Sequence, residues 1–153
     1  MKFKLLVLLL VQFPQVAAIA SCNSNSADEC YSQGVALKDI EAFEKACSLG
    51  HGLSCNHAGW NKRKNANAKE STDTETLFFK KGCELNHAGS CYNYACILAS
   101  SGLKDQALGT LKKAIINGYR DWNWIREDPD LDSIRSETEY KKIIVRYSSD
   151  LSF

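Results

Sequence analysis

One thirteen-residue stretch of this chain occurs twice, at residues 43–55 and again at residues 79–91. The copies lie 36 residues apart and are identical at seven positions, Phe43/Phe79, Lys45/Lys81, Cys47/Cys83, Leu49/Leu85, His51/His87, Ser54/Ser90 and Cys55/Cys91. A self-match at a period of about 20–50 residues is typical of proteins that stack small structural repeats. The duplication therefore predicts a repeat protein rather than a fold with a single central sheet.

The residues around the first cysteine of each copy follow a helical pattern. Ile40, Phe43 and Cys47 recur at helical spacing and form one apolar stripe. Three positions after the first cysteines stand Gly50 and Asn86, two residue types that tolerate the left-handed conformation that closes a helix. The chain should therefore end one helix, reverse and begin another between two cysteines. A disulfide closing so short a loop would add about 2–3 kcal/mol of stability.

The stretch Ala-Cys-Ser-Leu-Gly-His-Gly-Leu-Ser-Cys, residues 46–55, resembles the cysteine-rich Sel-type repeats, which are relatives of the tetratricopeptide repeat. The Helicobacter cysteine-rich proteins are the best-known members. The resemblance covers roughly residues 27–118. It implies an all-α fold, an α-solenoid of stacked antiparallel helix pairs, with disulfides Cys47–Cys55 and Cys83–Cys91 joining successive helices. It also implies a link to β-lactams, which some members of that family bind or slowly hydrolyse.

The expected domain organisation has four parts: residues 1–21 as a signal peptide, 22–27 as a tether, 28–118 as repeats and 119–153 as a terminal cap. Helices are expected at 28–38, 39–49, 52–64, 74–85, 88–101 and 103–117, with a polar loop at 62–76. The cap should contain short and final helices at 122–126 and 137–147. Ile115 aligns with Cys83, so a third copy of the repeat has lost its staple and kept an apolar residue. Trp122, Trp124 and Tyr140 are expected to form the core of the cap, because a solenoid must cover its last apolar surface.

Residues 1–21 have the form of an export signal. Lys2 and Lys4 precede an apolar run from Leu5 to Val11, which is too short to span a bilayer. Ala18-Ile-Ala suits ordinary signal peptidase and would release a soluble protein. Residues 19–22 also match a bacterial lipobox, which would place a lipid on Cys22. We expect location in the cell envelope, as a periplasmic or lipid-anchored outer-membrane protein, or release to the medium.

The fate of Cys22 depends on which signal is used. Cys22 and Cys30 are eight residues apart, as in the repeats, and a third disulfide between them would leave only Cys96 unpaired. A lipid on Cys22 would leave two thiols unpaired in an oxidising compartment, which is unfavourable. The four lipobox positions nevertheless give the lipid anchor a slight preference, and both alternatives stay open.

Charge and motifs exclude several classes of function. The chain has 19 basic and 18 acidic residues, so a nucleic-acid partner is not expected. Cys47, His51, Cys55 and His57 could ligate zinc, but duplicated cysteines in an exported chain favour disulfides over a metal. Cys96 is expected to be a buried free thiol. No cofactor, metal or catalytic residue is predicted.

One motif bears on catalysis. Ser101-Gly-Leu-Lys104 matches the Ser-x-x-Lys of serine β-lactamases, but it falls in a predicted turn and lacks the companion motifs. We therefore expect a module that binds or scaffolds an unknown protein or peptide, with membrane attachment only through Cys22. The alternative is a protein that binds β-lactams or peptidoglycan fragments and has weak β-lactamase activity.

Overall fold

A computed structural model describes residues 22–65 and 70–148, and the predicted signal peptide lies outside these ranges. Within them the chain is all-helical, without a strand. The elements are α1 (Ala27–Leu37), α2 (Ile40–Ser48), α3 (Gly52–Asn65), α4 (Glu70–Glu84), α5 (Ala88–Ser100), α6 (Lys104–Ile116), α7 (Trp122–Glu127), the 3-10 turn η1 (Pro129–Leu131), α8 (Asp132–Arg135) and α9 (Thr138–Ser148).

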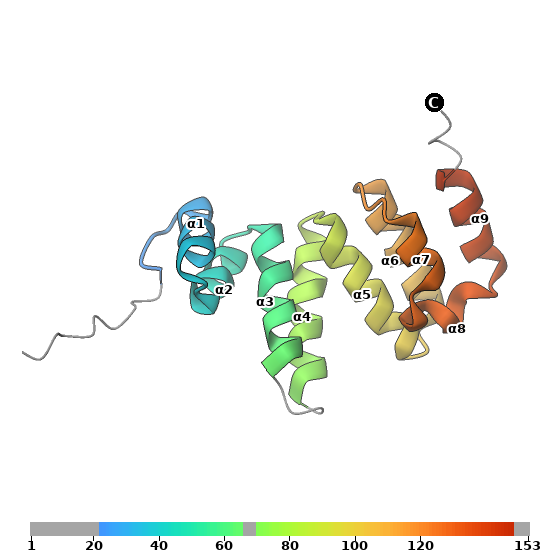
Figure 1. The fold of residues 1–153 in the computed structure, drawn as a ribbon, viewed down its shortest axis with the longest axis horizontal. Coiled ribbons are helices and arrows are strands. Elements are labelled where there is room, and N and C mark those ends of the chain that lie inside the picture. The colour runs from blue at the N-terminus through green and yellow to red at the C-terminus, as the bar shows by residue number, and fades with distance from the viewer. Residues whose placement is uncertain (1–21, 66–69, 149–153) are drawn as a thin grey trace, which may run out of the picture.

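The helices lie in a row that follows chain order. From α1 to α6 each helix packs against the one before it and the one after it. Next-but-one neighbours also touch, since α2 meets α4 and α3 meets α5. The row is elongated, with α1 at one end and α9 at the other (Figure 1). Elements η1, α8 and α9 return onto α5 and α6 and cover the end of the row.

Five turns of the row share one backbone geometry, two of them at Lys38 and Gly102. Gly50, Asn86 and Gly118 have φ of 99°, 61° and 105°, the left-handed conformation expected at the first two positions. The residue after each of them donates its backbone N–H to a carbonyl five residues back, as from His51 to Ala46 at 3.0 Å. Gly118 corresponds to Gly50 and Asn86 through the alignment of residues 111–115 with 79–83, and its turn has the same geometry. Its preceding helix ends in a fully buried Ile115 where the two stapled turns have a cysteine.

The prediction of a polar loop at residues 62–76 is wrong for most of that range. Helix α3 continues to Asn65 and α4 begins at Glu70, and only residues 66–69 lie between them, outside the described residues. Arg63 pairs with the buried carboxylate of Glu75 at 3.1 Å, joining the two helices near their ends. The polar residues of this stretch therefore belong mainly to helices with a solvent-facing side.

The cap contains the expected aromatic core except at one position. Trp122 and Tyr140 are buried, and the Tyr140 hydroxyl donates to the Ile125 carbonyl at 2.8 Å. Trp124 is 49% exposed, so the prediction that it belongs to the core is wrong. Positions two apart on a helix point about 200° apart, so Trp124 faces solvent when Trp122 faces the core.

Candidate functional site

The structure contains three disulfides, and all three join cysteines eight residues apart. Cys47–Cys55 and Cys83–Cys91 are the pairs that the family resemblance implied. Their sulfurs are therefore not available for the zinc alternative. The third bridge is Cys22–Cys30. One sulfur cannot carry both a disulfide and a thioether-linked lipid, so this bridge and a lipid on Cys22 exclude each other, and the lipid anchor stays a prediction.

The second cysteine of each bridge gives a common register for α1, α3 and α5. Counting two and five residues from Cys30, Cys55 and Cys91 gives positions that share one helix face. We call this the odd-helix face; it consists of Ser32 and Val35 on α1, His57 and Trp60 on α3, and Asn93 and Cys96 on α5.

The odd-helix face is open at one end and covered at the other. Val35 is 54% exposed and Trp60 is 40% exposed, whereas the equivalent Cys96 is 2% exposed. The difference arises because η1 and α8 pack on α5. Solvent therefore reaches large apolar side chains of this face only on α1 and α3.

Aromatic and imidazole rings fill the seam between α1, α2 and α3. The ring of Tyr31 lies 4.4 Å from that of His51 and 6.2 Å from that of His57, measured between centroids. His57 also stacks on Phe43 at 4.6 Å with the planes 17° apart. Burial, followed by the charge of His51, lowers the pKa of His57. The pKa of His87 is lowered by burial and then by His57 and His51.

Amide side chains continue this surface from α3 to α5. The Asn93 side-chain amide donates to the Asn56 carbonyl oxygen at 2.9 Å. Each amide offers two donors and two acceptor lone pairs, so one mutual bond leaves capacity for others. Trp60 is held by its neighbours, since the Arg63 guanidinium lies 5.1 Å from its ring and the ring meets Phe79 edge-on. The exposed indole is thus a rigid feature of the face.

A buried hydrogen-bond cluster locks the cap onto α5. Asp128, which is 4% exposed, accepts from the Tyr92 hydroxyl at 2.6 Å and from the Cys96 thiol at 3.6 Å. Its other carboxylate oxygen accepts the backbone N–H of Asp130 at 3.0 Å. Burial and the Asp128 carboxylate together raise the pKa values of Tyr92 and Cys96. Cys96 is therefore a buried, free and protonated thiol, as predicted, and a poor nucleophile.

Within the described ranges, three potential metal-ligating side chains lie close together at Cys96, Asp128 and Asp130, whose ligand atoms are within 4.8 Å of one another. Asp128 already accepts three hydrogen bonds there, and the thiol is protonated. These groups therefore form a hydrogen-bonded cluster that holds the cap on α5. The three histidines do not bring their ring nitrogens together in this way.

The Ser-x-x-Lys motif is not assembled as a catalytic pair. The Ser101 hydroxyl donates to the Ile97 carbonyl at 2.8 Å, inside its own helix turn. The Lys104 ammonium pairs with Glu137 at 2.7 Å. Each group has a different partner, so the lysine is not placed to accept the proton of the serine.

Residues 62–149 match the family model described as A/B hydrolase-like, N-terminal domain. The chain belongs to this family. The matched region runs from the end of α3 through the cap, so in this chain it contains the Cys83–Cys91 bridge and the Asp128 cluster and excludes α1 and α2.

Among curated proteins, the chain is similar to a chloroplastic protein from Arabidopsis thaliana, with 26% identity over 85 residues. The matched region is 55% of this chain and 25% of that protein, so the chain spans about a quarter of the length of its relative. No solved structure matches significantly. Among the described residues, no helix has both the length and the apolar character needed to cross a membrane.

Proposed function

We propose that this chain is an exported α-solenoid of Sel- and tetratricopeptide-like helix pairs that binds a peptide or protein segment on the odd-helix face. Its role would be binding or scaffolding in the bacterial envelope. The observation that carries the proposal is the unequal coverage of that face. The cap closes it at Cys96, while Val35 and Trp60 on α1 and α3 stay open.

Two features support the architecture in this proposal. The helices pack in chain order, and a single turn geometry recurs at Gly50, Asn86 and Gly118. Stacked repeats of this kind expose a continuous surface suited to extended ligands. The three disulfides support the compartment, because such bonds persist in oxidising surroundings and are rare in a reducing cytosol.

The chemistry of the open face suits a peptide. Trp60, Tyr31 and Val35 offer apolar and aromatic contact, and tryptophan and tyrosine are enriched among residues that dominate binding energy. Asn56, which is half-buried beside this face, offers an amide that can pair with a peptide backbone, and the buried Asn93 holds it in place. The family description, which names the N-terminal domain of hydrolase-like proteins, is compatible with a module that recognises a partner.

The test compares two tryptophans of similar exposure. Peptides selected from a displayed library against the intact, disulfide-bonded protein should bind wild type and Trp124→Ala alike. They should bind Trp60→Ala at least roughly tenfold more weakly, since loss of a dominant contact costs more than about 1.4 kcal/mol. Equal binding to Trp60→Ala, or dependence on Trp124, would reject the odd-helix face as the site.

A further inference from the structure

The histidine of each stapled turn accepts a hydrogen bond from the helix that follows. Nδ1 of His87 accepts the backbone N–H of Ser90 at 3.1 Å, and Nδ1 of His51 accepts that of Ser54 at 3.2 Å. The hydroxyls of the same serines lie 3.0 and 2.8 Å from these nitrogens. A backbone N–H can only donate, so Nδ1 must carry a lone pair in both rings. Both histidines are thus assigned as neutral imidazoles with their hydrogen on Nε2.

Protonation changes this bond from favourable to unfavourable. An imidazolium carries a proton on both ring nitrogens, so Nδ1 can no longer accept. The serine hydroxyl can rotate and become the acceptor, but the backbone N–H of Ser54 or Ser90 cannot. In addition, the positive charge would lie at the N-terminus of a helix, where the macrodipole disfavours cations. Helices α3 and α5, of 14 and 13 residues, would each lose a cap.

We propose that His51 and His87 form an acid-sensitive joint between successive helix pairs. Protonation releases the N-terminal caps of α3 and α5 and loosens their packing on the preceding helices. The bridges Cys47–Cys55 and Cys83–Cys91 hold the chain at the same two turns, so the change is a local loosening and not a separation. The joint does not depend on which ligand the protein binds.

The charges that face the joint are few. From α1, Asp28 places a carboxylate oxygen 3.9 Å from Nε2 of His51, but that side chain is 91% exposed and its field is screened by water. From α3, His57 acts on His87, as does His51. From α2, the uncharged ring of Phe43 stacks on His57. The imidazoles of His51 and His57 thus oppose protonation of His87.

The charged groups of α2 and α4 near these turns have other partners. Glu44 pairs with Lys62 at 2.5 Å. Lys81 donates to the Ser48 carbonyl at 3.4 Å. The Glu44 carboxylate is therefore engaged by Lys62, and Lys81 is itself positive, so neither neutralises a protonated ring at the joint.

The sign of the pH dependence follows from His87. Burial and the neighbouring imidazoles hold its pKa below the ordinary value of about 6.5. The unfolded chain then binds more protons than the folded chain as the pH falls below that value. The stabilising contribution is present in full above about pH 6.5 and is lost as the pH falls through the folded pKa.

The experiment replaces the capping rings with a residue that caps without titrating. Asparagine is among the best N-cap residues, so His51→Asn with His87→Asn should keep the caps and the fold. Wild-type Tm should fall between about pH 7.5 and pH 5, and the double variant should lose most of that fall. His57→Asn removes an imidazole of the same cluster that caps no helix. It should keep the larger part of the fall and lose only the part due to the lowered pKa of His57 and to its effect on His87. An undiminished fall in the double variant, or its loss in His57→Asn alone, would overturn the proposal.

A second measurement uses the unmodified protein and an internal control. The amide resonances of Ser54 and Ser90 should titrate together with the ring resonances of the histidine that each one contacts. The amide of Trp124 is capped instead by the Asp121 carboxylate at 3.0 Å. Its cap contains no imidazole, so it should not follow the ring titration of either histidine. Amides of Ser54 and Ser90 that ignore the ring titration would reject the joint even if Tm falls in acid.

Discussion

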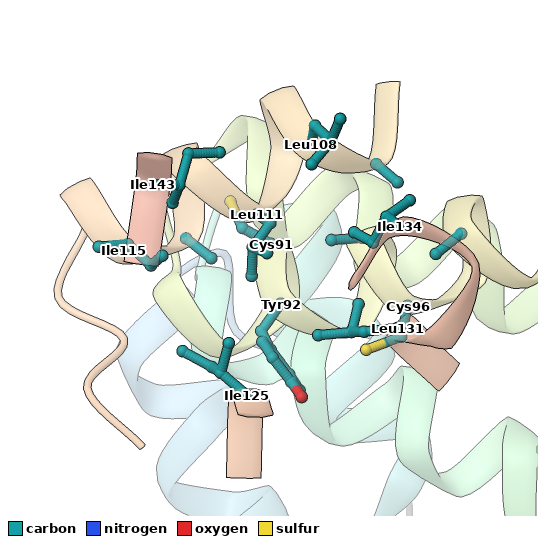
Figure 2. Packing of buried hydrophobic residues seen from close by; sticks show 14 of the residues in the cluster. Cys91, Tyr92, Cys96, Leu108, Leu111, Ile115, Ile125, Leu131, Ile134 and Ile143 are labelled. Atoms are coloured by element: carbon teal, nitrogen blue, oxygen red, sulfur yellow. The ribbon is translucent and has the colours of Figure 1, made fainter. Parts of the chain in front are cut away.

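The two ends of the helical row are held together by different means. The buried cluster at the N-terminal end consists of Cys22, Cys30, Ala42 and Ala46, with Tyr31 packed against it. The cluster at the C-terminal end contains large aliphatic side chains without solvent exposure, namely Leu111, Ile115, Ile125, Leu131 and Ile134 (Figure 2). Two of the three disulfides of the described chain, Cys22–Cys30 and Cys47–Cys55, lie outside the C-terminal cluster, whereas Cys83 and Cys91 belong to it. The N-terminal half also buries two large side chains, Phe43 and Phe79, beside its small residues.

The free energies of burying an aliphatic side chain and of closing a disulfide loop explain why the two ends are held differently. Burying a leucine or isoleucine stabilises a fold by about 1.5–3 kcal/mol, and an alanine offers much less apolar area. One short disulfide loop adds about 2–3 kcal/mol, so a staple can replace roughly one large core residue. The turn at Gly118 fits this exchange, since Ile115 is fully buried where the stapled turns have a cysteine. The N-terminal end should therefore depend more on the redox state of its surroundings than the C-terminal end, whose cluster has one bridge beside its large aliphatic side chains.

The largest expected effect is in the C-terminal core. Leu111→Ala removes a fully buried side chain and should lower the free energy of unfolding by about 2–5 kcal/mol. Leu77, which is 67% exposed, provides the matched control, and Leu77→Ala should cost less than about 0.5 kcal/mol. Denaturant titration of both variants measures this. Equal losses would show that the C-terminal core does not carry the stability assigned to it.

The next effect tests the staples. Replacing Cys47 and Cys55 together by alanine should destabilise the protein by about 2–3 kcal/mol through the unfolded chain. Hydrogen exchange should locate the loss in α2 and α3, while α6 keeps its protection. A reducing agent opens all three bridges, so in wild type it should extend the loss of protection to α1, α4 and α5. Loss of protection that is uniform along the row would mean that the two halves unfold as one unit and would break the comparison.

The Asp128 cluster should have an intermediate effect. Tyr92→Phe removes one hydroxyl from the carboxylate and should cost about 1–3 kcal/mol, because the buried carboxylate loses a charged hydrogen bond. The Cys96 thiol, whose pKa is raised by burial and by Asp128, should label slowly in the native wild type at mildly alkaline pH. Its labelling should quicken in Tyr92→Phe if the cap loosens. Unchanged stability in this variant would show that the cap is held by apolar packing alone.

The sequence predicted the stapled turns, because neighbouring residues determine their geometry. The cysteine spacing and the left-handed residues Gly50 and Asn86 lie within one turn, so the turn could be read from a few neighbouring residues. The helix ends near residues 62–76 could not, because the Arg63–Glu75 pair that joins them forms only after α3 and α4 pack.

The Asp128 cluster was missed for a related reason. Tyr92 lies 36 residues from Asp128, and no repeat or motif connects them. The coverage of Cys96, and with it the boundary of the open odd-helix face, depends on how the cap folds back onto α5. The sequence predicted only part of the role of the two capping histidines. The duplication marks His51 and His87 as turn residues, but their hydrogen-bond role needs the backbone geometry.

The smallest effect concerns the first staple and also decides how the chain is processed. Cys22–Cys30 ties only a terminal segment to α1, so replacing both by serine should lower global stability less than loss of Cys47–Cys55 and should mainly fray α1. Intact mass of the mature protein, before and after reduction, tests the bridge itself. An unmodified chain whose thiols appear only after reduction supports the staple. A lipid on Cys22 with a free Cys30 thiol would contradict it, and would mean that the N-terminal end is held by the membrane instead of by a covalent bridge.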